Sequence, residues 1–312
     1  MSGPVKRPSG VVVEELDDGR IKHRFRQSTI NELDVCYERG RRVMAGLVTS
    51  PPTDATCMGT AMHAGFEACI NNLLAHGEPI PADEMGELAL AAFDSMAADP
   101  AMQWTKYKLW AVERFLIQSA QAFHSMVLPK LDPIATEIPF GPITIHEDAE
   151  RVIEITGTID YLDQSGLADW KSAGDARKYG SEGWELKRWG IQPTVYTLAA
   201  THMGLVEPDA DGIVQFTYYA FVEGPSVEVV ELTVDRHAGD WSWLVERCIS
   251  VAHLVEGGLP TWPRSDSSAL CSPTWCPSWG SCKGRHYGPD WPKTSVPADE
   301  LLYVVGRGSD DC

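Results

Sequence analysis

The sequence predicts an α/β (α+β) fold in which a β-sheet is flanked by helices. Short runs rich in β-branched residues and bounded by Gly, Pro and Asp predict strands between residues 134 and 234. Apolar residues at helical spacing predict long helices before and between these strands. The tail from Leu259 onward has little periodicity but holds three clustered cysteines.

Length and composition indicate a folded protein with a sizeable core. The 312 residues can form one large domain or two small ones, and 44% of them are hydrophobic. No stretch has the apolar length of a membrane span, and the N-terminus has no apolar secretory segment, so we expect a cytoplasmic protein. The formal charge of −18 argues against a broad nucleic-acid-binding surface but leaves room for a local basic groove.

The first half of the chain is predicted to be mainly helical after an N-terminal hairpin around Asp17-Asp18-Gly19. Helices are expected over residues 30–44, 57–76, 85–98 and 102–126. The region from about 80 to 130 is predicted to be a helical insert without chemistry of its own. Its apolar residues recur at helical spacing and are expected to be core; they include Trp104, Leu109, Trp110, Phe115, Leu116 and Phe123.

Strands are predicted to dominate from Ile134 onward. Two short strands, a hairpin and two further strands are expected over residues 135–140, 143–146, 151–159, 167–170, 212–221 and 227–234. A helix is expected between Trp184 and Met203, starting properly near Gln192 because Pro193 removes a helix hydrogen bond. Asp235 is predicted to cap the final helix, which ends near Val255.

The hairpin from Gly157 to Lys171 carries the strongest candidate chemistry. Asp160 is expected to close its first strand, and Asp169 and Lys171 lie two residues apart on its second strand, hence on one face. Antiparallel pairing can bring Asp160 to the same side. Two carboxylates and an ammonium suit a divalent metal beside a phosphate. A solvated surface hairpin explains the same residues, so the choice depends on residues elsewhere.

His63 is a candidate third ligand on the helix predicted over residues 57–76. It is followed by Glu67 four residues later, on the same helix face. A single histidine at such a position is usually structural. It is a candidate metal ligand only if Asp160 and Asp169 lie close to it in the fold. A histidine ligand favours Mn²⁺ over Mg²⁺.

The clustered cysteines Cys271, Cys276 and Cys282 indicate a metal site before a disulfide in a cytoplasmic protein. Metal–thiolate bonds can fold a loop that lacks periodic structure. Zinc prefers Cys-x-x-Cys pairs, which are absent here, whereas an iron–sulfur cluster accepts looser spacing and needs a fourth thiolate. Cys36, expected in the middle of a helix, is the preferred fourth ligand, ahead of Cys57 and His286.

The order of these motifs resembles the RecB-type branch of the PD-(D/E)XK nucleases from about Ser28 to Arg285. The motifs that carry the resemblance are His63, Glu137, Gly157-Thr-Ile-Asp160, Asp169-Trp170-Lys171 and Gln192-x-x-x-Tyr196. One N-terminal cysteine with three C-terminal ones is similar to the iron–sulfur subgroup. That subgroup includes the CRISPR-associated RecB-like exonucleases and the AddB-type nuclease domains.

The resemblance implies a restriction-endonuclease-like mixed β-sheet, a helical insert and an iron–sulfur-bearing C-terminal segment. It implies Mg²⁺ or Mn²⁺ ligands at His63, Asp160, Asp169 and the backbone carbonyl of Trp170. Glu137, expected on a neighbouring strand, is a candidate outer ligand or hydrogen-bond acceptor for a ligand. Lys171 would be the catalytic lysine, and Gln192 and Tyr196 would position the nucleic-acid backbone and the lysine. The 4Fe–4S cluster would be held by Cys36, Cys271, Cys276 and Cys282.

Two features depart from the family pattern. Four residues separate Cys271 from Cys276, where the family usually has two, and Pro193 directly follows the motif residue Gln192.

The resemblance also sets the expected domain organisation and substrate. Residues 1–27 would be an arm and hairpin, 28–290 a single RecB-like nuclease domain with a cysteine segment at about 260–290, and 291–312 a tail. The expected activity is metal-dependent exonuclease hydrolysis of DNA at single-stranded or duplex ends, in recombination, repair or replication, with a recombination or helicase partner and no membrane. The alternatives are a non-catalytic iron–sulfur nucleic-acid-binding or recombination accessory protein with the same fold, and a zinc-bound structural protein.

Overall fold

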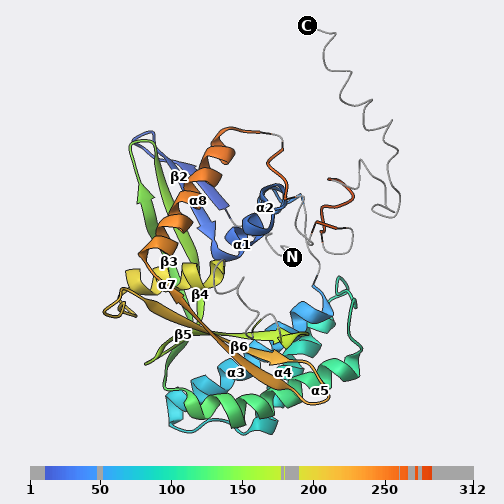
Figure 1. The fold of residues 1–312 in the computed structure, drawn as a ribbon. Coiled ribbons are helices and arrows are strands. Elements are labelled where there is room, and N and C mark those ends of the chain that lie inside the picture. Colours follow the sequence, from blue (N-terminus) through green and yellow to red (C-terminus); the bar gives the residue numbers. More distant parts are fainter. Residues whose placement is uncertain are drawn as a thin grey trace. The chain divides into compact units, whose positions relative to one another are not determined.

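The computed structural model describes residues 11–47, 52–176, 179, 190–259, 261–265, 271–272 and 276–282. The chain divides into two compact units, which we describe separately (Figure 1). The sheet unit comprises residues 10–31 and 51–259, and the cysteine unit comprises residues 1–9, 32–50 and 260–312. The domain boundaries expected from the sequence stay a prediction.

The sheet unit is built on a seven-stranded mixed β-sheet. Its strands are β1 (Val11–Glu15), β2 (Ile21–Arg26), β3 (Pro133–Glu147), β4 (Arg151–Asp163), β5 (Gly166–Ala173), β6 (Val214–Val222) and β7 (Glu228–Arg236). The order is β1-β2-β4-β5-β6-β7, with β3 on the other edge of β4. The β2–β4 and β5–β6 pairs are parallel and the others antiparallel. The mixed sheet expected from the sequence is therefore confirmed.

Helices cover both faces of this sheet, as Figure 1 shows. The helices α3 (Asp54–His76), α4 (Ala82–Ala97) and α5 (Leu109–Ala122) share a buried core with the sheet residues Tyr161, Trp170, Tyr219 and Phe221. Two short turns, Phe123–Val127 and Leu128–Lys130, connect α5 to β3. On the opposite face lie α7 (Ile191–His202) and α8 (Ala238–Glu256), where Tyr196 contacts Phe140 and Phe216.

The helix α3 begins and ends at the kinds of residue that cap helices. The Thr53 side chain accepts a hydrogen bond from the Thr56 backbone N–H, and the Thr56 hydroxyl accepts one from the Thr53 N–H. Gly77 ends the helix in the left-handed region at φ 81°, a conformation that costs glycine little. The helix therefore starts three residues before the predicted Cys57 and stops at the predicted His76.

The segment between α4 and α5 corrects the predicted helix over residues 102–126. Asp54, which is fully buried, accepts hydrogen bonds from the Thr105 N–H (3.1 Å), the Thr105 hydroxyl (2.6 Å) and the Lys106 N–H (2.7 Å). The Tyr107 N–H also donates to Asp54. These bonds use backbone donors in a loop, so the helix begins only at Leu109.

The burial predicted for the apolar residues of this segment is correct only in its second part. Phe115, Leu116 and Phe123 are buried, as expected. Trp104, in the loop, and Leu109 and Trp110, in the first turn of α5, are instead 48%, 46% and 58% exposed.

Two element boundaries also differ from the prediction. The strand β3 is one long strand instead of two, and its register with β4 shifts near Pro133, around Gly141-Pro142 and between Thr144 and His146. Within it, Glu137 has a positive φ of 47°. The helix α8 is capped by the side chain of His237, which accepts from the Gly239 N–H, and not by Asp235, because β7 continues to Arg236.

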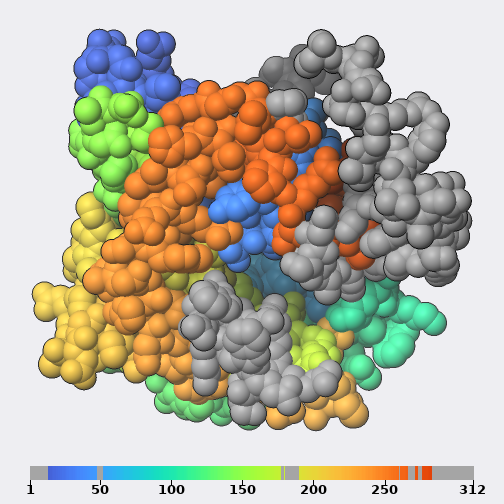
Figure 2. Space-filling view, turned by 45° about the horizontal axis from the view of Figure 1, so that its top comes forward, coloured from blue at the N-terminus to red at the C-terminus, as the bar shows by residue number. Residues whose placement is uncertain are grey.

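The C-terminal end of α8 is fastened to the strands by charged side chains. Glu256 accepts from His23 Nε2 (2.8 Å) and from the Arg151 guanidinium (3.3 Å), and Arg20 pairs with Glu147 (2.5 Å) across the neighbouring turns. In Figure 2, α8 (orange) lies on the surface beside the turns of the β1–β2 (blue) and β3–β4 (green) pairs.

The cysteine unit contains the end of α1 (Gln27–Val35) and all of α2 (Tyr37–Met44). A single helix with Cys36 at its centre was the expectation, and it is wrong. Cys36 has an extended conformation (φ −168°, ψ 124°) and separates α1 from α2 as the residue that precedes α2. The thiol of Cys36 thus lies at the start of α2, at the point where the helical conformation is interrupted.

Candidate active site

The candidate site lies where two strands of the sheet diverge. β4 and β5 pair only from Tyr161–Ala168 to Asp163–Gly166, next to their turn. On the same side of β4, β2 pairs with residues 151–156, so residues 157–160 lie between the two pairings. Along its other edge, β5 pairs with β6 from Leu167 to Ala173, so that beyond Ala168 it departs from β4 while staying in the sheet. Side chains from the helices can therefore reach the strand backbone at this point.

Three predicted ligands meet at this divergence. The ligand atoms of His63, Asp160 and Asp169 all lie within 4.8 Å of one another, and no other such group of His, Cys, Asp or Glu is found among the described residues. His63 Nδ1 lies 3.9 Å from Asp160 Oδ1, and His63 Nε2 lies 3.6 Å from Asp169 Oδ1. His63 Nε2 is also 2.6 Å from the Trp170 carbonyl oxygen, to which it donates, since a carbonyl only accepts.

The remaining predicted residues surround these three. Lys171 forms an ion pair with Asp169, on the same face of β5. From α7, Gln192 Nε2 donates to Asp160 Oδ2 (3.3 Å) and to the Tyr196 hydroxyl oxygen (3.2 Å). Pro193 lies in the first turn of α7, where a missing N–H leaves no helix hydrogen bond unmade. Gln192 and Tyr196 therefore face Asp160 despite that departure from the family pattern.

The donor set fits a divalent cation. Asp169 is fully buried, and its Oδ1 accepts no hydrogen bond from any described residue. A buried carboxylate oxygen without a partner is costly, and a metal ion is one of the few groups that offsets this cost. Two carboxylates, an imidazole and a carbonyl are ligands that suit Mg²⁺ or Mn²⁺.

The ionisable side chains of the site change one another's pKa values. Burial and the negative charge of Asp169 raise the pKa of Asp160. Burial lowers the pKa of His63, an effect that Asp169 opposes. Burial alone would lower the pKa of Lys171, but its pairing with Asp169 raises it instead. Binding a cation here favours the charged form of both carboxylates and would release the proton that Asp160 tends to hold.

Glu137, expected as an outer ligand or a hydrogen-bond acceptor for a ligand, lies beside the site on β3, with a positive φ of 47°. Its pKa is raised by burial and by the negative charges of Glu67 and Asp169. Glu67, one helical turn after His63, thus extends the same acidic group. The structure shows Glu137 near the ligands but gives it no hydrogen bond to them among the described residues.

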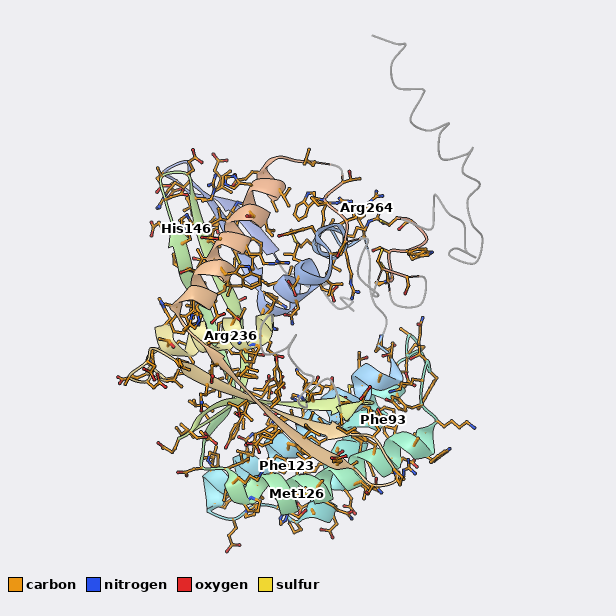
Figure 3. All side chains as sticks on the ribbon, in the orientation of Figure 1. Phe93, Phe123, Met126, His146, Arg236 and Arg264 are labelled. Carbon is orange, nitrogen blue, oxygen red and sulfur yellow. The ribbon has the colours of Figure 1, made fainter. Side chains whose placement is uncertain are left out.

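The sequence analysis did not identify Arg236, which binds the start of α7 and so helps to position Gln192. Its fully buried guanidinium donates to the Thr194 hydroxyl (2.8 Å) and to the Gly190 carbonyl (3.2 Å), so it holds the start of α7 (Figure 3). Gln192 lies between these two partners in sequence. A basic residue at a strand end usually reaches solvent, so no local pattern indicates this role.

The four candidate cluster cysteines all belong to the cysteine unit. Burial raises the pKa of the Cys276 thiol, and the thiols of Cys282 and Cys36 add to this rise. The thiols of Cys36 and Cys282 therefore both lie near the thiol of Cys276. Among the described residues, no three cysteine sulfur atoms lie within 4.8 Å of one another, as the ligands of a single ion would. That spacing counts against one zinc ion more than against a four-iron cluster, which is larger and holds its ligands further apart.

The alternative fourth ligands have different positions. Cys57 is buried in α3 of the sheet unit, where it contacts the sulfur of Met102 at 3.6 Å. His286 lies outside the described residues.

The mixed sheet and the carboxylate-rich candidate site are typical of a class of nucleases. The family model of the PD-(D/E)XK nuclease superfamily matches residues 28–283. The chain belongs to this superfamily, and the nuclease class expected from the sequence is confirmed.

One solved structure with a similar fold is that of a protein described as a "putative exonuclease" from Eubacterium rectale. It shares 12% sequence identity over 88% of this chain and 91% of its own, with a TM-score of 0.50. No curated protein matches the chain. None of the helices in the described part of the chain combines the length and the apolar character needed to span a membrane.

Proposed function

We propose that this protein is a metal-dependent DNA exonuclease that hydrolyses phosphodiester bonds at single-stranded ends. The observation that carries the proposal is the meeting of His63, Asp160 and Asp169 within 4.8 Å of one another. Lys171, paired with Asp169, adds a positive charge on the same face. A nuclease fold makes DNA the expected substrate.

Each residue of the site has a chemical role in this proposal. A divalent ion held by His63, Asp160, Asp169 and the Trp170 carbonyl would lower the pKa of a bound water and stabilise charge on the phosphate. Lys171 would orient the attacking water or neutralise a phosphoryl oxygen. Gln192 and Tyr196 would keep Asp160 in position and contact the backbone of the DNA.

The experiment that tests the proposal compares linear with circular single-stranded DNA, each with Mn²⁺, with Mg²⁺ and with EDTA. An exonuclease shortens the linear molecule in the presence of metal and leaves the circle intact. Cleavage of the circle would make the protein an endonuclease. Binding of both DNAs without hydrolysis under any metal would favour the alternative, a non-catalytic accessory protein with a nuclease fold.

We also propose that Cys36, Cys271, Cys276 and Cys282 bind a 4Fe–4S cluster with a structural role. Polar contacts support this, because they join α2 to the tail within the cysteine unit. Glu38 accepts from the Trp262 N–H (2.9 Å), and Arg42 donates to the Ser281 hydroxyl (2.5 Å). The helix that follows Cys36 is thus held to the segments on either side of Cys271 and Cys276.

Replacing Cys276 with Ser is expected to remove most of the iron and the broad visible absorption from protein purified without air. The reason is that a serine oxygen is a poor substitute for a thiolate ligand of iron. Iron and sulfide content and the absorption spectrum measure the result. Cys57→Ser is the matched control and should keep its iron, since Cys57 lies in the sheet unit. Full iron content in the Cys276 variant would reject this ligand set.

The RecB-type subgroup, a recombination or helicase partner and a cytoplasmic location remain predictions from the sequence. Membership of the iron–sulfur subgroup depends on the cluster, so the Cys276 experiment addresses that part of the assignment as well.

A further inference from the structure

Residues 104–114 form a basic and aromatic surface on a strongly acidic protein. This stretch holds three basic side chains and one acidic one, whereas the whole chain has a formal charge of −18. Lys106, Lys108 and Arg114 are exposed. The same stretch holds Trp104 and Trp110, which are 48% and 58% exposed. We call these five residues the Trp110 surface.

The Trp110 surface is held in a defined conformation. The backbone of residues 105–107 donates to the buried carboxylate of Asp54. Trp104 packs edge-on against Phe93, with ring centroids 5.9 Å apart; Phe93 is labelled in Figure 3. The Arg114 guanidinium lies 5.4 Å from the ring of Trp110, one helical turn away on α5. Exposed tryptophans that are fixed in this way lose little conformational freedom when they bind a ligand.

The Trp110 surface adjoins the strand that carries the catalytic residues. Lys106 Nζ lies 3.3 Å from Glu223, and the Tyr107 hydroxyl donates to the same carboxylate. The Glu223 N–H donates to the carbonyl of Ala173, the last residue of β5 (2.8 Å). Ala173 is two residues beyond Lys171, about 7 Å along an extended strand. A few nucleotides can therefore span the path from the active site to Lys106.

We propose that the Trp110 surface binds the single-stranded DNA that leads into the active site. The two tryptophans would stack on bases, and the lysines and arginine would contact phosphates. Duplex DNA buries its base faces, so stacking of this kind favours a single strand. A protein partner would have to desolvate three cations around the tryptophans, and lysine is depleted from protein interfaces. The inference rests on the proposed nuclease function. It assigns a DNA-binding role to the helical insert, which the sequence predicted to have no chemistry of its own.

Binding of a fluorescent oligothymidylate tests the surface separately from catalysis. It is measured by anisotropy in EDTA, in a Lys171→Met background that prevents cleavage. Trp110→Ala is expected to weaken binding about tenfold, the effect of losing one stacked base. Trp243→Ala is the matched control, because Arg247 lies 5.4 Å from Trp243 at the same helical spacing on α8. The control should bind as tightly as the parent.

The salt dependence of binding distinguishes stacking from charge contacts. Lys106→Gln together with Lys108→Gln should reduce the slope of log K against log salt by about 1.4, or 0.7 for each lost phosphate contact. Trp110→Ala should leave this slope unchanged. Trp110→Phe keeps an aromatic ring and should recover most of the affinity, which shows that the alanine variant lost stacking and not its fold.

Several results would overturn the proposal. An unchanged affinity of Trp110→Ala for oligothymidylate would do so. If that variant also lost concentration-dependent self-association, the surface would instead bind a second copy of the chain. Equal weakening on duplex and single-stranded DNA would also contradict it. Failure of the nuclease proposal looks different: the unmodified protein would then show no metal-dependent hydrolysis, whatever its affinity for oligothymidylate.

Discussion

Asp169→Asn is expected to abolish the stabilisation that Mn²⁺ gives to the folded protein. In the unmodified chain, Mn²⁺ at 100 times its dissociation constant should add about 2.7 kcal/mol to the free energy of unfolding. The asparagine side chain keeps the size of Asp169 but removes the charge that would hold the ion. Thermal unfolding with and without Mn²⁺ measures the difference, which corresponds to a shift of several degrees in Tm.

Asp163→Asn is the matched control for this variant. Asp163 is a buried acid of the same hairpin, but its Oδ1 accepts from the Ser165 N–H (2.7 Å), the Ser165 hydroxyl (2.6 Å) and the Gly166 N–H (3.0 Å). Its role is therefore to hold the turn. Asp163→Asn should lower Tm without metal and keep the shift that Mn²⁺ causes. An equal metal shift in Asp169→Asn would show that the ion binds elsewhere.

Glu38→Gln is expected to destabilise the cysteine unit by about 3 kcal/mol. Glu38 is buried and accepts from Arg41 (2.8 and 2.9 Å), Arg42 (2.7 Å) and the Trp262 N–H (2.9 Å). Burial alone would raise the pKa of Glu38, but these hydrogen bonds lower it to about 2. Amide hydrogen exchange in residues 37–44 and 261–265 should become about 100-fold faster in the variant.

The pH dependence has a definite sign. Because the pKa of Glu38 is lower in the folded state than its ordinary value of 4.5, its stabilising effect is complete above pH 4.5. It is lost as the pH falls through about 2. Glu38→Gln should lack this dependence. Glu32→Gln, which removes the partly exposed pair of Glu32 with Arg39, should cost at most about 1 kcal/mol. Equal effects of the two substitutions would mean that Glu38 is not the tie between α2 and the tail.

The sequence patterns correctly predicted the elements whose conformation is determined by residues close together in the chain. The strands β6 and β7 are correct to within two residues, because β-branched runs with turn residues between them have few alternatives. The end of α3 at Gly77 also follows from a single residue that tolerates the left-handed region.

The errors arise where distant residues override the local pattern. The loop before α5 exists because Asp54, some 50 positions earlier, binds its backbone. The break at Cys36 likewise leaves Glu38 free to bind the Trp262 N–H, more than 200 residues away. Neither contact can be read from a window of sequence.

The candidate site could be predicted to a large extent because its residues lie on motifs with fixed spacing. Asp169 and Lys171 share a face by the alternation of a strand, and Gln192 and Tyr196 share a helix face. The divergence of β4 and β5, which lets His63 reach the Trp170 carbonyl, depends on how β2 and β5 compete for the same edge of β4. That competition, and the buried Arg236 behind α7, are tertiary effects with no sequence signature.

The most direct test of the account is the Mn²⁺-dependent rate of nucleotide release from end-labelled single-stranded DNA by Lys171→Met. The control is Lys130→Met, which removes an exposed lysine paired with Glu231 (3.0 Å) on the surface. We predict that Lys171→Met lowers the rate by at least about 100-fold and that Lys130→Met keeps it. A Lys171→Met enzyme with the rate of the unmodified protein would contradict the central claim that this strand divergence is the site of hydrolysis.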